Sequence, residues 1–291
     1  MNNPIIDRIK QEALRHGDRI SLLAAFRLPE VKRSFDKQGI ETSRFNFTPS
    51  AGSDWTLQSV VAAASPSRRY YVSFDIDGRE FKAIIPACYV DDEKKNSEIE
   101  QYLKTVLEAE GYHIRQGKGL PLKALAAHTG LGGYGRNNLI YIEGFGSFCN
   151  LNIFFTDLPA AEEPFFPFKV LDGCKDCNRC IKNCPSGALR ADPFTIEAPR
   201  CLTRLNESGE PFPDWVEASW HNALVGCESC QLVCPRNSEL LEPVEEIARF
   251  NRAETEAFLQ NELPEEALEP LGIAHYREGL ARNLKSLLSV L

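Results

Sequence analysis

Residues 174–185 of the 291-residue chain read CKDCNRCIKNCP, a run in which four cysteines follow one another at short, regular intervals. The spacing C-x2-C-x2-C-x3-C-P is typical of 4Fe-4S clusters, because three closely spaced thiolates bind one cubane and the fourth cysteine reaches a second cluster. Residues 227–235, CESCQLVCP, repeat this motif without its first cysteine. Cys201 is the only cysteine between the two runs, and we therefore expect it to supply the missing ligand.

The eight cysteines divide into two complete ligand sets. One predicted 4Fe-4S cluster uses Cys174, Cys177, Cys180 and Cys234, and the other uses Cys184, Cys201, Cys227 and Cys230. Two structural zinc sites would also use eight thiolates, but zinc favours separated C-x2-C pairs, whereas three cysteines at steps of three followed by Cys-Pro favour cubanes. Cys88 and Cys149 lie outside both motifs, and we interpret them as buried, inert thiols.

Composition and charge narrow the class of protein. The chain is 43% hydrophobic and 25% charged, values typical of a globular protein. Its apolar stretches fall short of the roughly 18 residues that a membrane helix needs, and its first thirty residues lack an export signal, so we expect a cytoplasmic protein without a membrane partner. The net charge of −8 argues against a nucleic-acid partner.

The distribution of cysteines and prolines predicts three domains, at residues 1–168, 169–240 and 241–291. Eight of the ten cysteines lie between residues 174 and 234, and three prolines mark a connector at residues 158–168. Apolar residues at helical spacing predict helices at residues 5–14 and 99–110, and short helices in the C-terminal tail, where Ile247 and Phe250 belong to the pattern.

Strand signals complete a predicted α+β first domain with a partly antiparallel sheet. Residues 70–76 and 80–85 flank Asp77-Gly78 and predict a hairpin with a tight turn. Further strands are predicted at residues 58–63, 139–143 and 150–155.

Two other motifs occur in a fixed order with the cysteine runs. They are AAHTGLGGYGRNNLI at residues 126–140 and TDLP at residues 156–159. Together with the cysteines they resemble the cobalamin-dependent epoxyqueuosine reductases and, in the form G-L-G-x-x-G-R, the related reductive dehalogenases. The resemblance covers residues 55–240. It implies an N-terminal α/β sandwich-like reductase domain, a two-cluster ferredoxin-like domain and a short helical tail.

The resemblance also implies an oxidoreductase in which the two clusters deliver electrons to a bound corrinoid, a cobalamin, that reduces a substrate. The expected partners are a small-molecule substrate and an external electron donor such as ferredoxin or flavodoxin. The chain ends without the helical-repeat extension that many of these enzymes use toward tRNA, so we expect a substrate other than tRNA. A corrinoid-free electron-transfer protein and a reductive activator of another corrinoid protein are the alternatives.

The glycine-rich run is the predicted corrinoid contact. Backbone without side chains can approach a large flat ligand and offer it N–H groups. A helix end with a turn is the alternative, but it needs only one or two glycines. No histidine has the D-x-H-x-x-G context of a cobalt ligand. The predicted corrinoid-binding residues are Gly130, Gly132, Gly133, Gly135, Arg136 and Asn137.

The proton donor is the remaining catalytic role. The segment where the family places its proton-donating aspartate falls at residues 116–119, which read QGKG and contain no acid. We therefore rank Tyr134 first, Lys118 second and His128 third as donors. A tyrosine donates as a neutral group, whereas a lysine needs its pKa lowered toward the working pH. In the alternative interpretation, Lys118 is a solvated loop residue and Tyr134 packs on the corrin or in the core.

Overall fold

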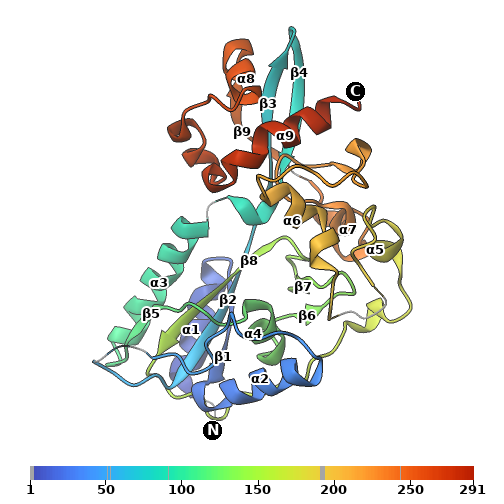
Figure 1. Ribbon diagram of the computed structural model, residues 1–291. Coiled ribbons are helices and arrows are strands. Elements are labelled where there is room, and N and C mark those ends of the chain that lie inside the picture. The colour runs from blue at the N-terminus through green and yellow to red at the C-terminus, as the bar shows by residue number, and fades with distance from the viewer. Residues whose placement is uncertain (1–2, 51, 53, 91, 191–193, 243) are drawn as a thin grey trace. The chain divides into compact units, whose positions relative to one another are not determined.

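The computed structural model describes residues 3–50, 52, 54–90, 92–190, 194–242 and 244–291 (Figure 1). The chain forms two compact units. The first unit comprises Met1–Pro66 and Glu93–Lys175, and the second comprises Ser67–Asp92 and Asp176–Leu291. No helix among the described residues is long and apolar enough to cross a membrane.

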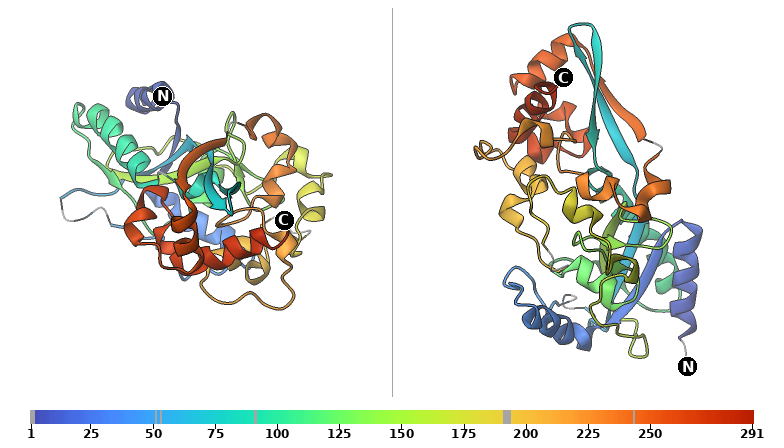
Figure 2. Two further views of the ribbon diagram at one scale, coloured as in Figure 1. Left: turned by 90° about the horizontal axis from the view of Figure 1, so that it is seen from above. Right: turned by 90° about the vertical axis from the view of Figure 1, so that its right-hand side faces the viewer.

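The first unit is built on an antiparallel sheet with strand order β1-β2-β8-β5. Its strands are β1 (Arg19–Ala24), β2 (Ser59–Pro66), β8 (Cys149–Thr156) and β5 (Ile114–Gln116). Helices cover both faces, and α1 (Pro4–Arg15) and α2 (Leu28–Lys37) lie on opposite sides of the strands in the right-hand view of Figure 2. The predicted α/β sandwich with its antiparallel sheet is therefore confirmed.

Successive side chains along each strand point to opposite faces of the sheet, and this explains why the sheet has a hydrophobic core on both faces. Val61 and Phe154 pack on the face that is covered by α1 and α3 (Asp92–Glu108). Their neighbours Val60 and Phe155 point to the other face, toward α2 and α4 (Leu122–His128). Because both faces are buried, β2 reads as an almost continuous apolar run. The two predicted helices of this unit are confirmed as α1 and α3.

A second, two-stranded sheet of the first unit follows α4. It pairs β6 (Gly133–Tyr134) with β7 (Ile140–Tyr141) in antiparallel fashion. The strand predicted at residues 139–143 is therefore confined to two residues. This small sheet carries the centre of the glycine-rich run.

The second unit contains a three-stranded sheet of order β4-β3-β9. Strands β3 (Arg69–Ile76) and β4 (Arg79–Ile85) form the predicted hairpin, and Asp77 and Gly78 both have positive φ, of 51° and 79°, as a tight hairpin turn requires. Strand β9 (Val244–Phe250) pairs with β3 in parallel. The helical interpretation of Ile247 and Phe250 is therefore wrong, because strand pairing with the hairpin overrides their spacing.

Helices pack on this sheet and complete the core of the second unit. Phe258 of α8 (Arg252–Leu259) and Leu284 of α9 (Arg277–Leu288) belong to the same buried cluster as Phe74 of β3. Around the cysteine motifs lie the short helices α5 (Arg179–Lys182), α6 (Leu202–Glu207) and α7 (Ser229–Leu232). The helical character predicted for the end of the chain is confirmed by α8 and α9. The 3-10 helices of both units are η1 (Ala25–Arg27), η2 (Ala87–Tyr89), η3 (Asp172–Cys174), η4 (Ala198–Arg200), η5 (Ala218–Trp220), η6 (Pro235–Leu240), η7 (Glu265–Ala267), η8 (Glu269–Leu271) and η9 (Ala274–Tyr276).

The two units group the residues differently from the boundaries at 168 and 240. The hairpin, which lies inside the predicted first domain, packs with the C-terminal helices in the second unit. Compact units of packing and functional domains need not coincide, so the three domains stay a prediction.

Candidate functional site

Each of the eight motif cysteines is half-buried. Cys180 lies in α5 and Cys230 in α7, while Cys201 directly precedes α6. Helices α5 and α7 contact each other, so the structure brings the helical parts of the two motifs together within the second unit. Eight cysteine sulfurs at this spacing fit the donor chemistry of two 4Fe-4S clusters.

Cys201 and Cys227, two predicted ligands of the same cluster, lie close enough to interact electrostatically. Burial raises the pKa of the Cys227 thiol, hydrogen bonds to Ser229 and Asn222 oppose that rise, and the charge of Cys201 adds to it. Among the described residues, no group of three or more His, Cys, Asp or Glu side chains is arranged to hold a metal ion. The division of the cysteines into two sets of four stays a prediction.

The two cysteines outside the motifs are less buried than the sequence suggested. Cys88 is exposed and Cys149 is half-buried. The expectation of two buried thiols is therefore wrong for Cys88, which lies in the short helix η2 of the second unit.

The glycine-rich run follows the end of α4, where Gly130 adopts a φ of 73°. A Cβ atom on Gly132 would lie 2.6 Å from Cδ1 of Ile142 and 2.8 Å from the backbone oxygen of Tyr141. Added Cβ atoms on the other three glycines would approach side chains of the same unit to 2.5 Å; these glycines are Gly130, Gly133 and Gly135. Close packing within the chain thus accounts for four glycines.

Most N–H groups of this run are already used. The N–H groups of Gly130 and Gly132 donate to backbone oxygens of α4, and that of Gly135 donates to the backbone oxygen of Leu139. Arg136 donates through Nη1 to the backbone oxygen of Lys175 over 3.1 Å. Nδ2 of the buried Asn137 donates to the hydroxyl of Tyr141 over 3.0 Å. Corrinoid binding by these residues stays a prediction. The N–H groups described here already have acceptors within the protein, so they are not available to bind a phosphate group of a ligand.

His128 is buried in an aromatic sandwich. Its ring stacks on Phe165 and Phe168, with centroids 4.4 and 4.3 Å away, and Nδ1 lies 2.6 Å from the backbone oxygen of Phe166. Because a carbonyl only accepts, Nδ1 carries the proton, and burial lowers the pKa of this histidine. Residues 158–168, which the sequence predicted to be a connector, therefore pack on α4 through their phenylalanines. The ring N–H of His128 already donates a hydrogen bond within the protein.

Tyr134 and Lys118 occupy contrasting environments. Tyr134 is 6% exposed, its ring meets Phe168 edge-on at 5.6 Å, and burial raises the pKa of its hydroxyl. Lys118 is exposed in the loop after β5. The structure thus places Tyr134 and His128 around the same phenylalanine and Lys118 at the surface. The exposed Lys118 and the buried Tyr134 match the alternative interpretation, in which Lys118 is a solvated loop residue and Tyr134 packs in the core. The role of Tyr134, Lys118 and His128 in proton donation stays a prediction.

The sequence reasoning missed three polar residues beside the second cysteine motif, namely Arg69, Asn222 and Glu228. They form a hydrogen-bonded network that reaches Cys227. The one signal available in the sequence was Glu228, which stands between the predicted ligands Cys227 and Cys230. A carboxylate close to thiolates needs a positively charged partner, because like charges repel one another.

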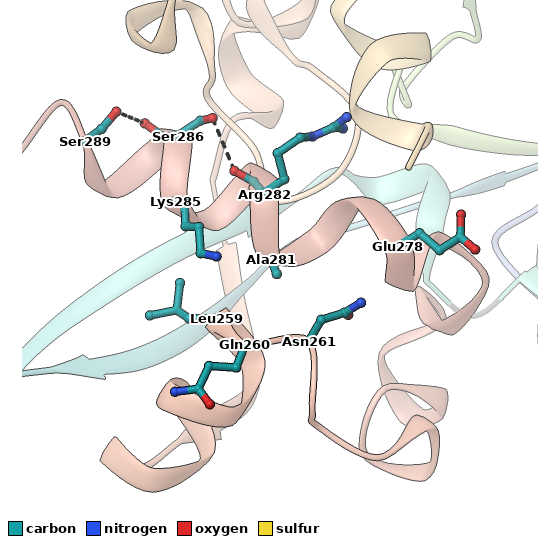
Figure 3. Close-up of a pocket in the computed structure, with 9 residues that line it drawn as sticks. All are labelled: Leu259, Gln260, Asn261, Glu278, Ala281, Arg282, Lys285, Ser286 and Ser289. Carbon is teal, nitrogen blue, oxygen red and sulfur yellow. Dashed lines mark hydrogen bonds between the residues drawn. The ribbon is translucent and has the colours of Figure 1, made fainter. Parts of the chain in front are cut away.

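A separate pocket of about 580 Å³ lies between the end of α8 and α9 (Figure 3). Gln260, Asn261 and Lys285 line it, together with Ser286, whose hydroxyl donates to the backbone oxygen of Arg282. The lining includes none of the predicted site residues. We therefore do not assign the predicted function to this pocket.

Comparison with known proteins agrees with the cysteine motifs. Residues 173–237 match the family described as a 4Fe-4S double cluster binding domain. Curated epoxyqueuosine reductases from Listeria monocytogenes and Bacillus subtilis are 33% and 35% identical to this chain over 133 and 115 residues. The predicted resemblance to the epoxyqueuosine reductases is confirmed. These alignments cover 43% and 40% of this chain but only 34% and 28% of the relatives, about a third of their length.

Solved structures extend the likeness to almost the whole chain. An epoxyqueuosine reductase structure from Bacillus subtilis has a TM-score of 0.67 at 21% identity and covers 97% of this chain and 80% of its own. One from Streptococcus thermophilus has a TM-score of 0.67 at 19% identity and covers 99% and 81%. At such identities the likeness shows the fold, which both units share with the epoxyqueuosine reductases.

Proposed function

We propose that this protein is an iron-sulfur oxidoreductase whose two 4Fe-4S clusters deliver electrons to a bound corrinoid, and that a small substrate is reduced there. One observation carries the proposal: a 4Fe-4S double cluster binding segment is joined to a complete α/β sandwich. An electron carrier needs only the cluster segment, so the additional sandwich supports a bound ligand or substrate. An external donor such as ferredoxin or flavodoxin would supply the electrons.

The corrinoid part of the proposal rests on the sequence resemblance. When bound, a corrinoid supplies the metal-centred reducing chemistry that protein side chains lack. The chain itself would supply eight cysteine sulfurs for the clusters, and the resemblance assigns contact with the corrinoid to residues 130–137.

Anaerobic reconstitution tests this function. Protein purified without oxygen is expected to contain about eight irons per chain and, after incubation with cobalamin and gel filtration, about one cobalt. The ultraviolet-visible spectrum should contain both cluster and corrinoid bands. Eight irons without retained cobalamin would favour a corrinoid-free electron-transfer protein or a reductive activator. Two zincs and no iron would overturn the cluster assignment.

We further propose that the substrate is a small molecule rather than tRNA. One solved epoxyqueuosine reductase structure contains an epoxyqueuosine-modified tRNA stem loop, so tRNA is the substrate to test against. With a net charge of −8, this chain gains little from neutralising phosphates. We expect no submicromolar binding of tRNA at physiological salt in a filter-binding assay. Submicromolar affinity would make tRNA the preferred substrate class.

Tyr134 is our proposed proton donor, since a tyrosine hydroxyl is neutral and carries its proton at physiological pH. Tyr134→Phe should slow turnover about a hundredfold, as loss of a positioned general acid typically does. Iron and corrinoid content should be unchanged. Tyr112→Phe, which removes a hydroxyl elsewhere in the first unit, is the control. Equal turnover of both variants in a steady-state reduction assay would remove Tyr134 from the mechanism.

A further inference from the structure

Asn222 presents its amide to a predicted cluster ligand. Its Nδ2 donates to Oγ of Ser229 over 2.7 Å, to the backbone oxygen of Trp220 over 3.2 Å and to Sγ of Cys227 over 3.4 Å, so two N–H groups are shared among three acceptors. Its Oδ1 accepts the backbone N–H of Glu228 over 2.8 Å. Because an N–H donor occupies the oxygen side of the amide, the nitrogen side must face the sulfur.

Glu228, whose backbone N–H donates to Asn222, is itself held in place by an ion pair. It stands between Cys227 and Cys230 in sequence, and it is fully buried. Arg69 of β3 clamps its carboxylate with two N–H groups, from Nε to Oε1 over 3.0 Å and from Nη2 to Oε2 over 2.8 Å. The remaining guanidinium nitrogen, Nη1, donates to the backbone oxygen of Leu241 over 2.5 Å. A bidentate pair of this kind fixes both position and orientation of the carboxylate.

These contacts form a continuous chain from the hairpin to the sulfur. Arg69 fixes the side chain of Glu228, the backbone of Glu228 orients Asn222, and Asn222 points an N–H group at Cys227. Hydrogen bonds to cluster sulfurs raise the reduction potential, because they stabilise the reduced, more electron-rich state.

We propose that Asn222 is a positioning residue that raises the reduction potential of the 4Fe-4S cluster bound by Cys227, and that the Arg69–Glu228 pair holds it in place. The inference rests on the double-cluster part of the proposed function and does not require a corrinoid. It predicts that the two clusters of this protein can be tuned separately.

The test is a redox titration of the anaerobically purified full chain, monitored by electron paramagnetic resonance. Asn222→Asp keeps the size of the side chain and an acceptor oxygen but removes the N–H donor. At fixed potential, the reduced-to-oxidised ratio of one cluster should fall about tenfold, which is a shift of about 59 mV for a one-electron couple. Iron content should be unchanged.

Asn183→Asp is the matched control. Asn183 adjoins Cys184, a predicted ligand of the same cluster, but it is exposed and its Nδ2 donates to the backbone oxygen of Arg179. This variant introduces the same negative charge without removing a hydrogen bond to sulfur. Its ratio should change much less than that of Asn222→Asp. Equal shifts of the midpoint potential in Asn222→Asp and Asn183→Asp would mean that the added negative charge alone causes the effect. That result would overturn the proposal.

Ser229→Ala keeps the proposal testable if Asn222→Asp loses its cluster. The Cys227 thiol donates to Ser229 Oγ over 3.4 Å. When Cys227 is a deprotonated cluster ligand, only the hydroxyl can donate, so its loss should lower the midpoint potential in the same direction by a smaller amount. Ser219→Ala, at an exposed position of the same unit, should leave the midpoint unchanged. An unchanged midpoint in Ser229→Ala and Asn222→Asp would overturn the inference alone. Absence of clusters from the wild-type chain would instead overturn the proposed function.

Discussion

Replacing Arg69 with methionine is expected to lower the free energy of unfolding by about 3–5 kcal/mol, because it leaves the buried carboxylate of Glu228 without a partner. Glu228 is 0% exposed and Arg69 is 8% exposed, so water cannot take over the interaction. The loss should appear as a lower midpoint of anaerobic urea unfolding, followed by circular dichroism.

The neighbouring arginine is a control of the same chemical type. Arg68 pairs with Glu245, but its side chain is 64% exposed. Exposed ion pairs contribute about 0–1 kcal/mol, so Arg68→Met should have a small effect. In the double variant Arg69→Met, Glu228→Gln, the unpaired charge is absent, and part of the lost stability should return. Similar losses for Arg69→Met and Arg68→Met would contradict the assigned role of the buried pair.

Replacing Cys201 with alanine should remove about four of the roughly eight irons, because a 4Fe-4S cluster requires four thiolate ligands. Cys201 stands alone between the two motifs and lies near Cys227 in the structure. Iron can be counted by a colorimetric assay on anaerobically purified protein. The electron paramagnetic resonance spectrum should then retain the signal of one cluster.

Two cysteines outside the motifs provide the comparison. Cys88→Ala and Cys149→Ala should keep the full iron content, although Cys88 is exposed and Cys149 is half-buried. Equal iron in the wild type and the Cys201→Ala variant would exclude Cys201 as a ligand. Loss of iron in Cys149→Ala would require a different division of the cysteines.

Features encoded by neighbouring residues could be predicted from the sequence. The cysteine spacing identified the double-cluster segment, because most of the ligands occur in two short runs whose spacing is typical of 4Fe-4S clusters. Asp77-Gly78 predicted the hairpin, because both residues adopt the positive φ of a tight turn. The helices α1 and α3 could also be predicted, because the helical spacing of apolar residues is a property of neighbouring residues.

Other features depend on residues that are far apart in the sequence. Ile247 and Phe250 have helical spacing, but pairing with β3 places them in a strand. The four glycines of the glycine-rich run suggested a ligand, whereas packing against residues such as Phe166 and Leu171 explains their small size.

The sequence by itself determined the cluster chemistry, the hairpin and the family resemblance of this protein. Only the tertiary structure decided which charges are buried and what surrounds the cluster ligands. Arg69 and Glu228 are 159 residues apart, and nothing in either local sequence marks them as partners. The physical reason is that the cost of a buried charge depends on the groups that folding brings to it, and local spacing does not specify those groups.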